Sequence, residues 1–368
     1  MQPQAYWIGF NKIRGIGSVR LKQLLDYFGS LEVAWNASYS ALREAGLGEK
    51  VTRTFLQTRP SIDLDLEMEK LSKFGIQVVI LDDQNYPHRL KEIEQPPPVL
   101  FVKGELMPQD DWAVAIVGTR QNSAYGRQLT EELAMFLAMN HVTVISGLAR
   151  GIDGIAHEAA LKAGGRSLAV LGCGVDQVYP PEHRTTAEKI INNGALISEY
   201  AIGTPPDGLN FPPRNRIISG LSLATIVIEA GENSGALITA TFAVNQGREV
   251  FAAPGNFYAP KSKGTNRLIR DGARPLIDFN DILEVLHLEH VQDFQVAQKN
   301  LPDDPVQSVI FEILSKEALY VDDILAQTGL PVDKVSSALT IMELKGLVRQ
   351  TSPMTFFAIK EEYKNYKD

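Results

Sequence analysis

The stretch Phe211–Gly255 constrains the fold most, because it joins an apolar strand to a glycine-tipped helix start. Within it, the run Leu223–Ile228 is almost wholly apolar and rich in β-branched residues, as in a strand buried on both faces of a parallel sheet. The segment Gly231-Glu-Asn-Ser-Gly235 ends this run, and a helix is predicted to follow over Ala236–Asn245. The stretch therefore predicts a strand, a turn and a helix of an α/β protein.

The start of the predicted helix is a candidate anion site. Ser234 can accept a hydrogen bond from the first free N–H groups, and Gly235 lets a ligand approach the backbone. A helix N-terminus carries partial positive charge, which favours a negatively charged group. Three polar side chains precede it, at the start of a further helix predicted over Asn215–Leu221: Arg214, Asn215 and Arg216. We interpret this stretch as a phosphate-binding edge.

Strands and helices alternate along the middle of the chain. The predicted strands are Gln77–Leu81, Val99–Val102, Val114–Val117, Thr143–Ser146, Ser167–Leu171, Ala195–Ser198, Leu223–Ile228 and Val250–Ala253. Earlier helices are predicted over Tyr125–Met139, Asp153–Ala163 and Pro181–Asn192. From Val114 onward this alternation indicates a doubly wound parallel sheet with right-handed crossovers and helices on both faces.

Two further domains are predicted around this sheet domain of residues 75–290. Residues 1–74 show helical periodicity without an alternating strand, and their Gly15-Ile16-Gly17 suits either a phosphate-contacting helix-hairpin-helix turn or a purely structural one. A polar linker is expected over Glu284–Asp304. Residues 305–360 then form a winged-helix module, with helices over Val306–Leu314, Val321–Gln327 and Pro331–Lys345 and a hairpin over Gly346–Ile359.

Composition excludes several classes of protein. Cys173 is the only cysteine among 368 residues, which argues against a disulfide framework or a zinc site of paired cysteines and favours a cytoplasmic setting. Neither a secretion signal nor an apolar run of membrane-spanning length is present, so no membrane association is expected. The net charge of −8 argues against non-specific coating of nucleic acid. Residues 205–275, however, hold eight Lys/Arg and five Asp/Glu, a local charge of +3.

Small or polar residues directly follow three predicted strands: Gly118-Thr-Arg-Gln-Asn-Ser123, Ser146-Gly-Leu-Ala-Arg-Gly-Ile-Asp153 and Gly231-Glu-Asn-Ser-Gly235. Open α/β sheets bind ligands outside the carboxyl ends of their strands, so we expect three helix N-termini to converge on one ligand. An ordinary βα turn explains any one of these segments equally well. Together with Arg120, Arg214 and Arg216, the three favour a ligand with several phosphates.

No dinucleotide or ATP motif accompanies these segments. Neither Gly118–Gly126 nor Gly172–Gln177 fits G-x-G-x-x-G, and G-x-x-x-x-G-K-[ST] does not occur. Cys173 suits a small buried side chain better than a reactive thiol. We therefore expect no cofactor.

The candidates for catalysis are few. Asp153 and His157 are one helical turn apart, which suits either an acid–base pair or stabilisation of a helix start. Glu199 and Glu229 end strands at the ligand edge, where either is a candidate base. Neither a Ser/His/Asp order nor H-E-x-x-H is present. We therefore expect a binding protein without catalytic or metal-ligating residues.

The charges of the winged-helix module oppose contact with duplex DNA. Residues 302–360 carry eight acidic and five basic side chains, and the helix that would enter the major groove offers only Lys334 and Lys345. Contact with another protein is the favoured use of this module.

Six blocks carry a resemblance to a known family: Gly118-Thr-Arg-Gln-Asn-Ser-Ala-Tyr-Gly126, Ser146-Gly-Leu-Ala-Arg-Gly-Ile-Asp153, Tyr179-Pro180, Phe211-Pro-Pro-Arg-Asn-Arg216, Ser234-Gly-Ala-Leu-Ile-Thr239 and Arg267-Leu-Ile-Arg-Asp-Gly-Ala273. The chain resembles the DNA-processing protein A family (DprA, also called Smf) from about residue 5 to 360. The resemblance implies a sterile-alpha-motif-like helical domain, an extended Rossmann domain and a winged-helix tail. It also implies a homodimer that binds and protects single-stranded DNA and loads the RecA recombinase in natural transformation, without known catalysis.

The resemblance also implies roles for individual residues. Arg120 resembles the DNA-contacting arginine of the family, and Phe211 would supply a face on which a base stacks. The phosphate-holding edge would be Arg214, Asn215, Arg216, Ser234 and Gly235. Further DNA-binding residues are expected from the other strand ends and the basic segment: Ser123, Ser146, Gly147 and Lys263. Some members have a lysine after the Tyr-Pro pair. Pro181 stands there in this chain, so that contact would fall to His183 or Arg184.

Two other functions remain open at the level of sequence. A lonely-guy-type phosphoribohydrolase has a related Rossmann scaffold, but its Pro-Gly-Gly-x-Gly-Thr segment is similar to Gly231–Ala236 only in position. It would release free base from nucleoside monophosphates. A transcription regulator acting through the winged-helix module would bind duplex more tightly than single strands.

Overall fold

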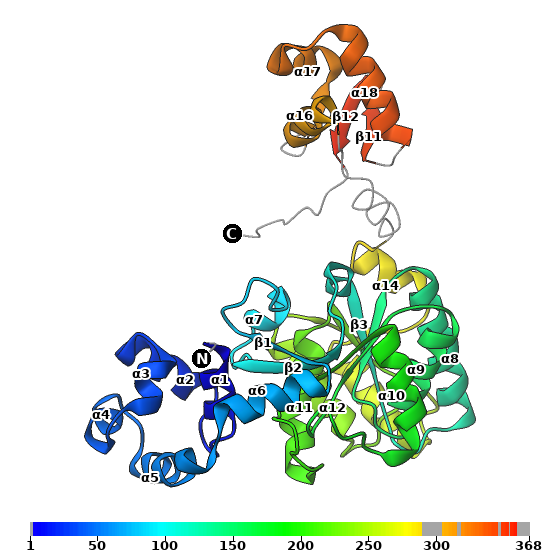
Figure 1. Ribbon diagram of the computed structural model, residues 1–368. Coiled ribbons are helices and arrows are strands. Elements are labelled where there is room, and N and C mark those ends of the chain that lie inside the picture. The colour runs from blue at the N-terminus through cyan, green and yellow to red at the C-terminus, as the bar shows by residue number, and fades with distance from the viewer. Residues whose placement is uncertain (1–2, 289–303, 315–317, 345–346, 353, 359–368) are drawn as a thin grey trace. The chain divides into compact units, whose positions relative to one another are not determined.

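The computed structural model describes residues 3–288, 304–314, 318–344, 347–352 and 354–358. The chain divides into two compact units, Met1–Ile282 and Leu283–Asp368. The first unit contains helices α1–α13 and a large sheet, and the second contains the winged-helix elements (Figure 1). Within the described residues, no helix is long and apolar enough to cross a membrane.

The large sheet has the strand order β1-β2-β6-β5-β4-β3-β7-β8-β9. Its strands are β1 Ile76–Ile80, β2 Val99–Gly104, β3 Ala113–Val117, β4 Thr143–Ser146, β5 Ser167–Val170, β6 Gly194–Ser198, β7 Ala224–Val227, β8 Glu249–Ala252 and β9 Arg274–Pro275. The seven strands from β6 to β9 run parallel. The predicted parallel sheet is confirmed, with two differences. β2 pairs antiparallel with β6 and with the edge strand β1, and β9 was not predicted.

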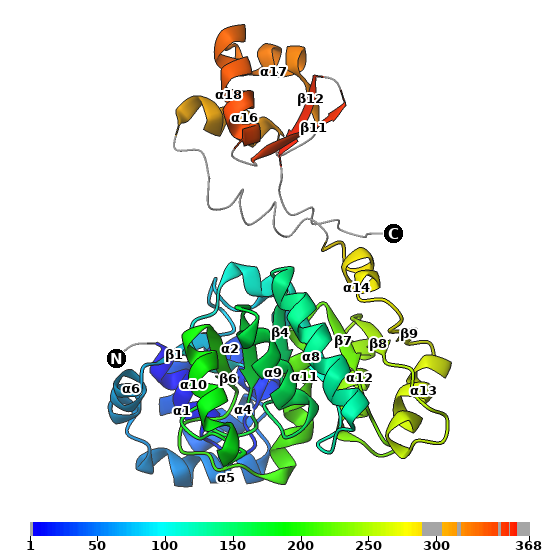
Figure 2. The same ribbon diagram turned by 90° about the vertical axis from the view of Figure 1, so that its right-hand side faces the viewer.

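Helices cover both faces of this sheet. α8 (Ala124–Met139), α9 (Ile152–Lys162) and α10 (Arg184–Asn192) pack in a row, and α11 (Phe211–Gly220) packs against α12 (Gly235–Asn245) (Figure 2). Successive residues of β5 enter different cores, because side chains of a strand alternate between faces. Ala169 packs in the cluster that contains Ala187 of α10, whereas Leu168 packs in the cluster that contains Ile217 of α11. The fold is therefore doubly wound, as predicted.

Two predicted helices of the sheet domain begin more than one residue from their predicted start. α11 begins at Phe211, four residues before the predicted start, because prolines at its first positions suit a helix start. The helix predicted over Pro181–Asn192 begins as the 3₁₀-helix η3, Pro181–His183, before α10. The remaining short elements of this region are α7 His88–Lys91, η2 Pro108–Asp111, η4 Gly208–Asn210, η5 Pro260–Ser262, α13 Lys263–Arg270 and α14 Asn280–Val285.

The N-terminal helices share one hydrophobic core with the sheet. They are α1 Gln4–Asn11, α2 Ser18–Phe28, α3 Leu31–Asn36, α4 Tyr39–Glu44, α5 Glu49–Thr58, η1 Arg59–Ser61 and α6 Leu64–Lys73. The Phe10 ring stacks on Phe55 at 5.2 Å and meets Trp35 edge-on at 5.1 Å. The same buried cluster extends to Phe101 of β2 and Leu171 beyond β5. These helices are thus fixed to the antiparallel edge of the sheet.

The second unit contains the winged-helix module. Its elements are α16 Pro305–Leu314, β10 Leu319–Tyr320, α17 Val321–Thr328, α18 Val332–Leu344, β11 Val348–Ser352 and β12 Thr355–Ala358, around a core of Ile310, Ile324, Leu339 and Phe356. The predicted helices and hairpin are present within one or two residues at most ends. The predicted linker over 284–304 lies mostly outside the described residues, as do Lys345, Gly346 and Ile359.

Candidate functional site

A cleft of about 720 Å³ opens at the point where the strand order of the sheet reverses. β4 lies on one side of β3 and β7 on the other, so the helices after β3 and β7 leave toward opposite faces. The cleft is lined by the loop 118–121 after β3, the start of α12 and the start of α11. The expected ligand edge is therefore a real cleft at the carboxyl ends of the strands.

Phe211 is the central aromatic residue of this cleft. Its half-buried ring stacks against Tyr179 at a centroid distance of 5.8 Å and an interplanar angle of 23°. The guanidinium groups of Arg120 and Arg214 lie 5.6 and 5.9 Å from the centre of the same ring. A Cβ at Gly172 would lie 2.7 Å from Cδ1 of Phe211, so only glycine leaves room for the ring. Arg120 is exposed, so its charge is available to a ligand.

Arg214 lies at the base of the cleft, almost completely buried at 5 % exposure. Its Nη1 donates to the carbonyl oxygens of Gly147, at 2.9 Å, and Val170, and its Nε donates to Asn215 Oδ1 at 3.2 Å. Burial lowers the pKa of Arg214, and the nearby Asp153 opposes this effect. A Cβ at Gly147 would lie 2.6 Å from Nη2 of Arg214. Gly147 thus makes room for the arginine.

The start of α12 opens to the cleft. Ser234 accepts a hydrogen bond from the N–H of Ala236 at 3.3 Å, as its predicted capping role requires. No atom lies within 4 Å of a Cβ built on Gly235, so the backbone there is accessible. Asn215 donates to the carbonyl oxygen of Gly235 at 3.4 Å and links α11 to this helix start. These three residues come together with Arg120 and Phe211, as expected.

The start of α8 already holds an anion from the protein itself. Glu229, which is 4 % exposed, accepts from the backbone N–H of Ser123 at 2.8 Å and from its hydroxyl at 2.5 Å. The Ser123 hydroxyl also caps α8 by accepting from Gly126 N–H at 3.0 Å. Ser123 therefore faces away from the cleft, against expectation. The predicted convergence of three helix starts on one ligand is corrected here, because the Glu229 carboxylate takes the ligand's place.

The segment after β4 is also engaged internally. The Ser146 hydroxyl is fully buried and donates to the carbonyl oxygen of Ile116 at 2.6 Å, so it does not line the cleft. Asp153 accepts from the N–H groups of Gly147 and Ala149 at 3.2 and 3.4 Å. Burial raises the pKa of Asp153, and Arg214 opposes the rise. Of this segment, Ala149 and Asp153 line the cleft.

Asp153 and His157 do not form the acid–base pair considered from sequence. His157 is fully buried, and its Nδ1 lies 2.7 Å from the Ser167 hydroxyl. Asp153 has different hydrogen-bond partners, the N–H groups of Gly147 and Ala149. Burial lowers the pKa of His157 to about 3, with contributions from His183 and Arg214. His157 is therefore neutral at physiological pH and has a structural position.

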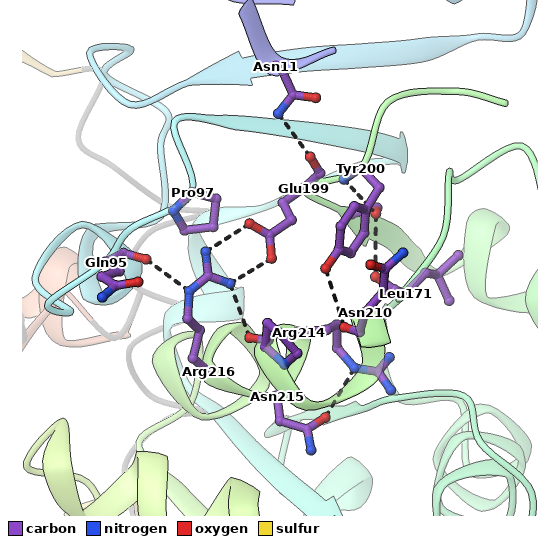
Figure 3. A network of polar contacts seen from close by, with 12 residues as sticks. Asn11, Gln95, Pro97, Leu171, Glu199, Tyr200, Asn210, Arg214, Asn215 and Arg216 are labelled. Carbon is purple, nitrogen blue, oxygen red and sulfur yellow. Dashed lines mark hydrogen bonds and ion pairs between the residues drawn. The ribbon is translucent and has the colours of Figure 1, made fainter. Parts of the chain in front are cut away.

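Arg216 points away from the cleft, against expectation. Its Nη1 and Nη2 donate to the two carboxylate oxygens of Glu199 at 2.6 and 2.8 Å, and its Nε donates to Gln95 O at 3.0 Å (Figure 3). Burial lowers the pKa of Arg216, but the Glu199 carboxylate outweighs this effect and raises it. Residues two apart on a helix face different sides, so Arg214 and Arg216 form no common patch. That spacing was a signal in the sequence.

The remaining expected contacts lie around the cleft. Lys263, at the start of α13, is half exposed and pairs with Glu232 at 3.3 Å, outside the cleft lining. His183 Nδ1 lies 3.0 Å from the carbonyl oxygen of Leu148, whereas Arg184 is exposed. Tyr179, which sequence reasoning named only as half of a motif, is the stacking partner of Phe211. Its position after the glycine turn that follows β5 was the available signal.

The described residues suit neither a metal site nor a reactive thiol. They contain no group of three or more His, Cys, Asp or Glu side chains that could hold a metal ion. The Cys173 thiol is buried and lies 3.2 Å from Gln177 O, and burial raises its pKa to about 11. Cys173 is thus a protonated core residue at neutral pH, as expected for a small buried side chain.

Two family models match the chain. Residues 77–287 match the model described as DNA recombination-mediator protein A. Residues 296–352 match the model of the DprA winged helix domain. Together they cover nearly all of the large sheet and most of the winged-helix module.

Individual proteins are similar along much of the chain. Protein Smf of Synechocystis sp. is 35% identical, over 96% of this chain and 98% of that protein. The X-ray structure of DNA processing protein A from Streptococcus pneumoniae superposes with a TM-score of 0.67 and 34% identity, over 77% of this chain and 98% of that chain. DNA processing protein A from Helicobacter pylori, whose structure was described for its single-stranded DNA binding mode, gives a TM-score of 0.53 and 30% identity, over 58% and 97%.

Proposed function

The chain belongs to the DNA recombination-mediator protein A family, and from this premise we propose that it binds single-stranded DNA in the cleft at the switch point of its sheet. The observation that carries the proposal is the Phe211 ring, which lies in the cleft with the guanidinium groups of Arg120 and Arg214 at 5.6 and 5.9 Å from its centre. The stacked Phe211 and Tyr179 rings would offer a surface to a base when the exposed Arg120 side chain turns toward a phosphate, and the nearby cations attract the phosphates. Duplex DNA hides its base faces, so the arrangement suits a single strand.

The phosphates would contact the exposed Arg120 and the open start of α12. Gly235 lets the sugar–phosphate backbone approach the first N–H groups of this helix, whose partial positive charge attracts an anion. Arg214 would act from below, chiefly by fixing Asn215 and the floor of the cleft, because its Nη1 is already bound to two carbonyl oxygens. Ser123, Ser146 and Arg216 have partners of their own and would support the site indirectly.

The role of the protein would be to hold the strand, without catalysis. The acid–base candidates support this view, because Glu199 and Glu229 are bound to Arg216 and Ser123, and burial keeps His157 neutral. We further propose that the protein acts as a homodimer, protects incoming DNA and delivers it to the RecA recombinase in natural transformation. The winged-helix module, with its excess of acidic residues, would contact protein in that process.

Fluorescence anisotropy with labelled oligonucleotides tests the proposal. We expect the protein to bind single strands more tightly than duplex, and Arg120→Ala to weaken binding by about 10-fold or more, since a charged hydrogen bond contributes about 1.5–3 kcal/mol. Lys189→Ala is a control, because this exposed cation lies on α10, away from the cleft. Tighter binding of duplex would favour a transcription regulator. Release of free base from nucleoside monophosphates would favour a phosphoribohydrolase.

A further inference from the structure

The connection between β8 and α13 presents two neighbouring aromatic rings to solvent. Phe257 is 79 % exposed and Tyr258 86 %, and their ring centroids lie 5.3 Å apart at 88°. Aromatic side chains usually bury most of their surface, so an adjacent exposed pair has no role in the core. We call residues 253–259 the aromatic loop.

The aromatic loop is braced at both ends. Asn266 of α13 accepts from Gly255 N–H at 3.1 Å and donates to Gly255 O at 3.0 Å. Asn256 accepts from the N–H of Tyr258 at 2.9 Å through its side chain and from the N–H of Ala259 at 3.0 Å through its carbonyl. These bonds fix the backbone that carries the two rings. Binding therefore requires little ordering of the loop.

A cavity of about 480 Å³ adjoins the aromatic loop and is lined by Tyr125, Pro254 and Lys261, among others. The half-exposed Tyr125 ring is held by a hydrogen bond from its hydroxyl to Pro254 O at 3.0 Å. Within the part of the chain that the structure describes, Lys261 has no ion-pair partner. Lys263 is half exposed. The loop thus combines stacking surfaces with cations.

The residues that directly follow the aromatic loop are hydrogen-bonded to the segment that forms the cleft. Ala230 N–H donates to Lys261 O at 2.8 Å, and Gly264 N–H donates to Ala230 O at 2.8 Å. Ala230 lies four residues before Ser234 and Lys261 three residues after Tyr258. At about 3.5 Å per extended residue, this path from the cleft to the rings is at most roughly 28 Å. One strand of a few nucleotides can cover that distance.

We propose that Phe257 and Tyr258 form a second stacking platform for bases of the strand held in the cleft. The inference rests on the proposed function, since it assigns the onward path of the same single strand. Exposed rings close in the chain to Lys261 and Lys263 match the unstacked bases and phosphates of a single strand. The second platform would lengthen the site beyond the cleft, so its contribution depends on oligonucleotide length.

The test compares a short oligothymidylate of about 4 nucleotides with a longer one of about 16 nucleotides. Phe257→Ala/Tyr258→Ala should weaken binding of the long strand by roughly 5- to 100-fold and leave the short one within about twofold. Phe257→Tyr/Tyr258→Phe keeps both rings and should bind as the wild type does. Tyr39→Ala, which removes an exposed ring of α4, is the matched control and should change neither affinity.

A second measurement identifies stacking as the cause. Removing one base at a time from the long strand, with the phosphates kept, should weaken wild-type binding at one or two positions beyond those that fill the cleft. The same removals should have little further effect in the alanine double variant. Equal affinity of wild type and double variant for the long strand would overturn the proposal, as would a uniform effect of base removal.

Two outcomes separate this inference from the proposed function. If the long strand binds, Arg120→Ala weakens it and the aromatic variant does not, the cleft assignment stands and the second platform is wrong. If wild type fails to bind single strands at all, the proposed function itself is wrong. Light scattering on the same variants tests whether the two rings contact a second copy of the chain. A shift of the double variant to a smaller species without DNA would show that the rings contact a second copy of the chain, which also overturns the proposal.

Discussion

The Glu229 carboxylate lies at the N-terminus of α8, where the backbone N–H and the hydroxyl of Ser123 donate to its two oxygens at 2.8 and 2.5 Å. A buried anion at this position neutralises the positive end of the α8 dipole. A Cβ at Gly126 would lie 2.3 Å from Oε2 of Glu229, so the glycine in the first turn of α8 makes room for the carboxylate. The loop after β3 is thereby fixed, and Arg120 projects from it toward the cleft.

Glu229→Gln should destabilise the fold and leave DNA binding nearly unchanged. The substitution removes the charge and turns an amide toward two donors, so we expect the free energy of unfolding to fall by about 1–2 kcal/mol. Denaturant unfolding measures the stability, and anisotropy should give an affinity within about twofold of wild type. A stable variant with greatly weakened binding would instead place Glu229 in the ligand site.

The Arg216–Glu199 pair should likewise contribute to the stability of the fold and have little effect on DNA affinity. Both side chains are mostly buried, at 14% and 16% exposure, so Arg216→Ala leaves a carboxylate without its partner and should lower stability by roughly 3 kcal/mol. Glu199→Ala should be comparably harmful, and the double variant less harmful than the sum of the two. Additive effects would show that the pair contributes no coupling. At a temperature where Arg216→Ala is folded, its affinity for single strands should stay within about threefold of wild type.

The sequence predicted the sheet well because its central strands are largely apolar. The runs around Val114–Val117 and Leu223–Ile228 alternate with helical periodicity, and this pattern alone determines a doubly wound arrangement. The direction of β2 was not predictable, because an apolar strand can pair with its neighbour in either direction. The short β9 consists of an arginine and a proline, which resemble loop composition.

The sequence predicted where the cleft lies, but only some of the residues that line it. Arg120, Phe211, Asn215, Ser234 and Gly235 line one cleft. Arg216 and Ser123 do not join them, because each binds a glutamate that follows a strand, and such partners lie far apart in sequence. Local spacing shows which side of a helix a residue occupies, whereas the partner on that side depends on the tertiary fold. The exposed rings of the aromatic loop were missed because exposure is not visible in sequence.

The buried His157 predicts a specific loss of stability in acid. The Ser167 hydroxyl donates to Val144 O at 3.0 Å and so accepts from His157 Nδ1–H, while burial disfavours the charged form of the ring. The pKa of His157 is about 3 in the folded protein, against about 6.5 in the unfolded chain. Between these values the unfolded chain binds more protons, so the stabilisation is complete above about pH 6.5 and is lost as pH falls toward 3.

His157→Gln tests this dependence by difference. Its stability should fall less steeply than that of wild type between about pH 6.5 and 4, because glutamine does not titrate. Burial raises the pKa of Asp153, so this residue adds to the stability of the fold as the pH falls. Asp153 is present in both proteins, so its contribution to stability cancels in the comparison. Parallel stability curves would show that His157 is protonated in the folded state.

Salt dependence of single-strand binding tests the charges of the cleft directly. About three cations remain for phosphates once Arg216 is excluded by its pair with Glu199 and Arg214 by its burial: Arg120, Lys261 and Lys263. At roughly −0.7 per phosphate contact, log affinity against log salt should have a slope of about −2 despite the net charge of −8, because counterions are released locally. Arg120→Ala should flatten the slope by a little under one unit.

Ser234→Pro removes a cap and crowds the start of α12, so it should weaken binding while the slope is kept, since backbone N–H groups release no counterions. Arg216→Ala should also keep the slope, because its guanidinium is bound to Glu199 and not to DNA. A wild-type slope near zero would mean that the cleft holds a small, weakly charged ligand, and flattening by Arg216→Ala would return that arginine to the phosphate-binding edge.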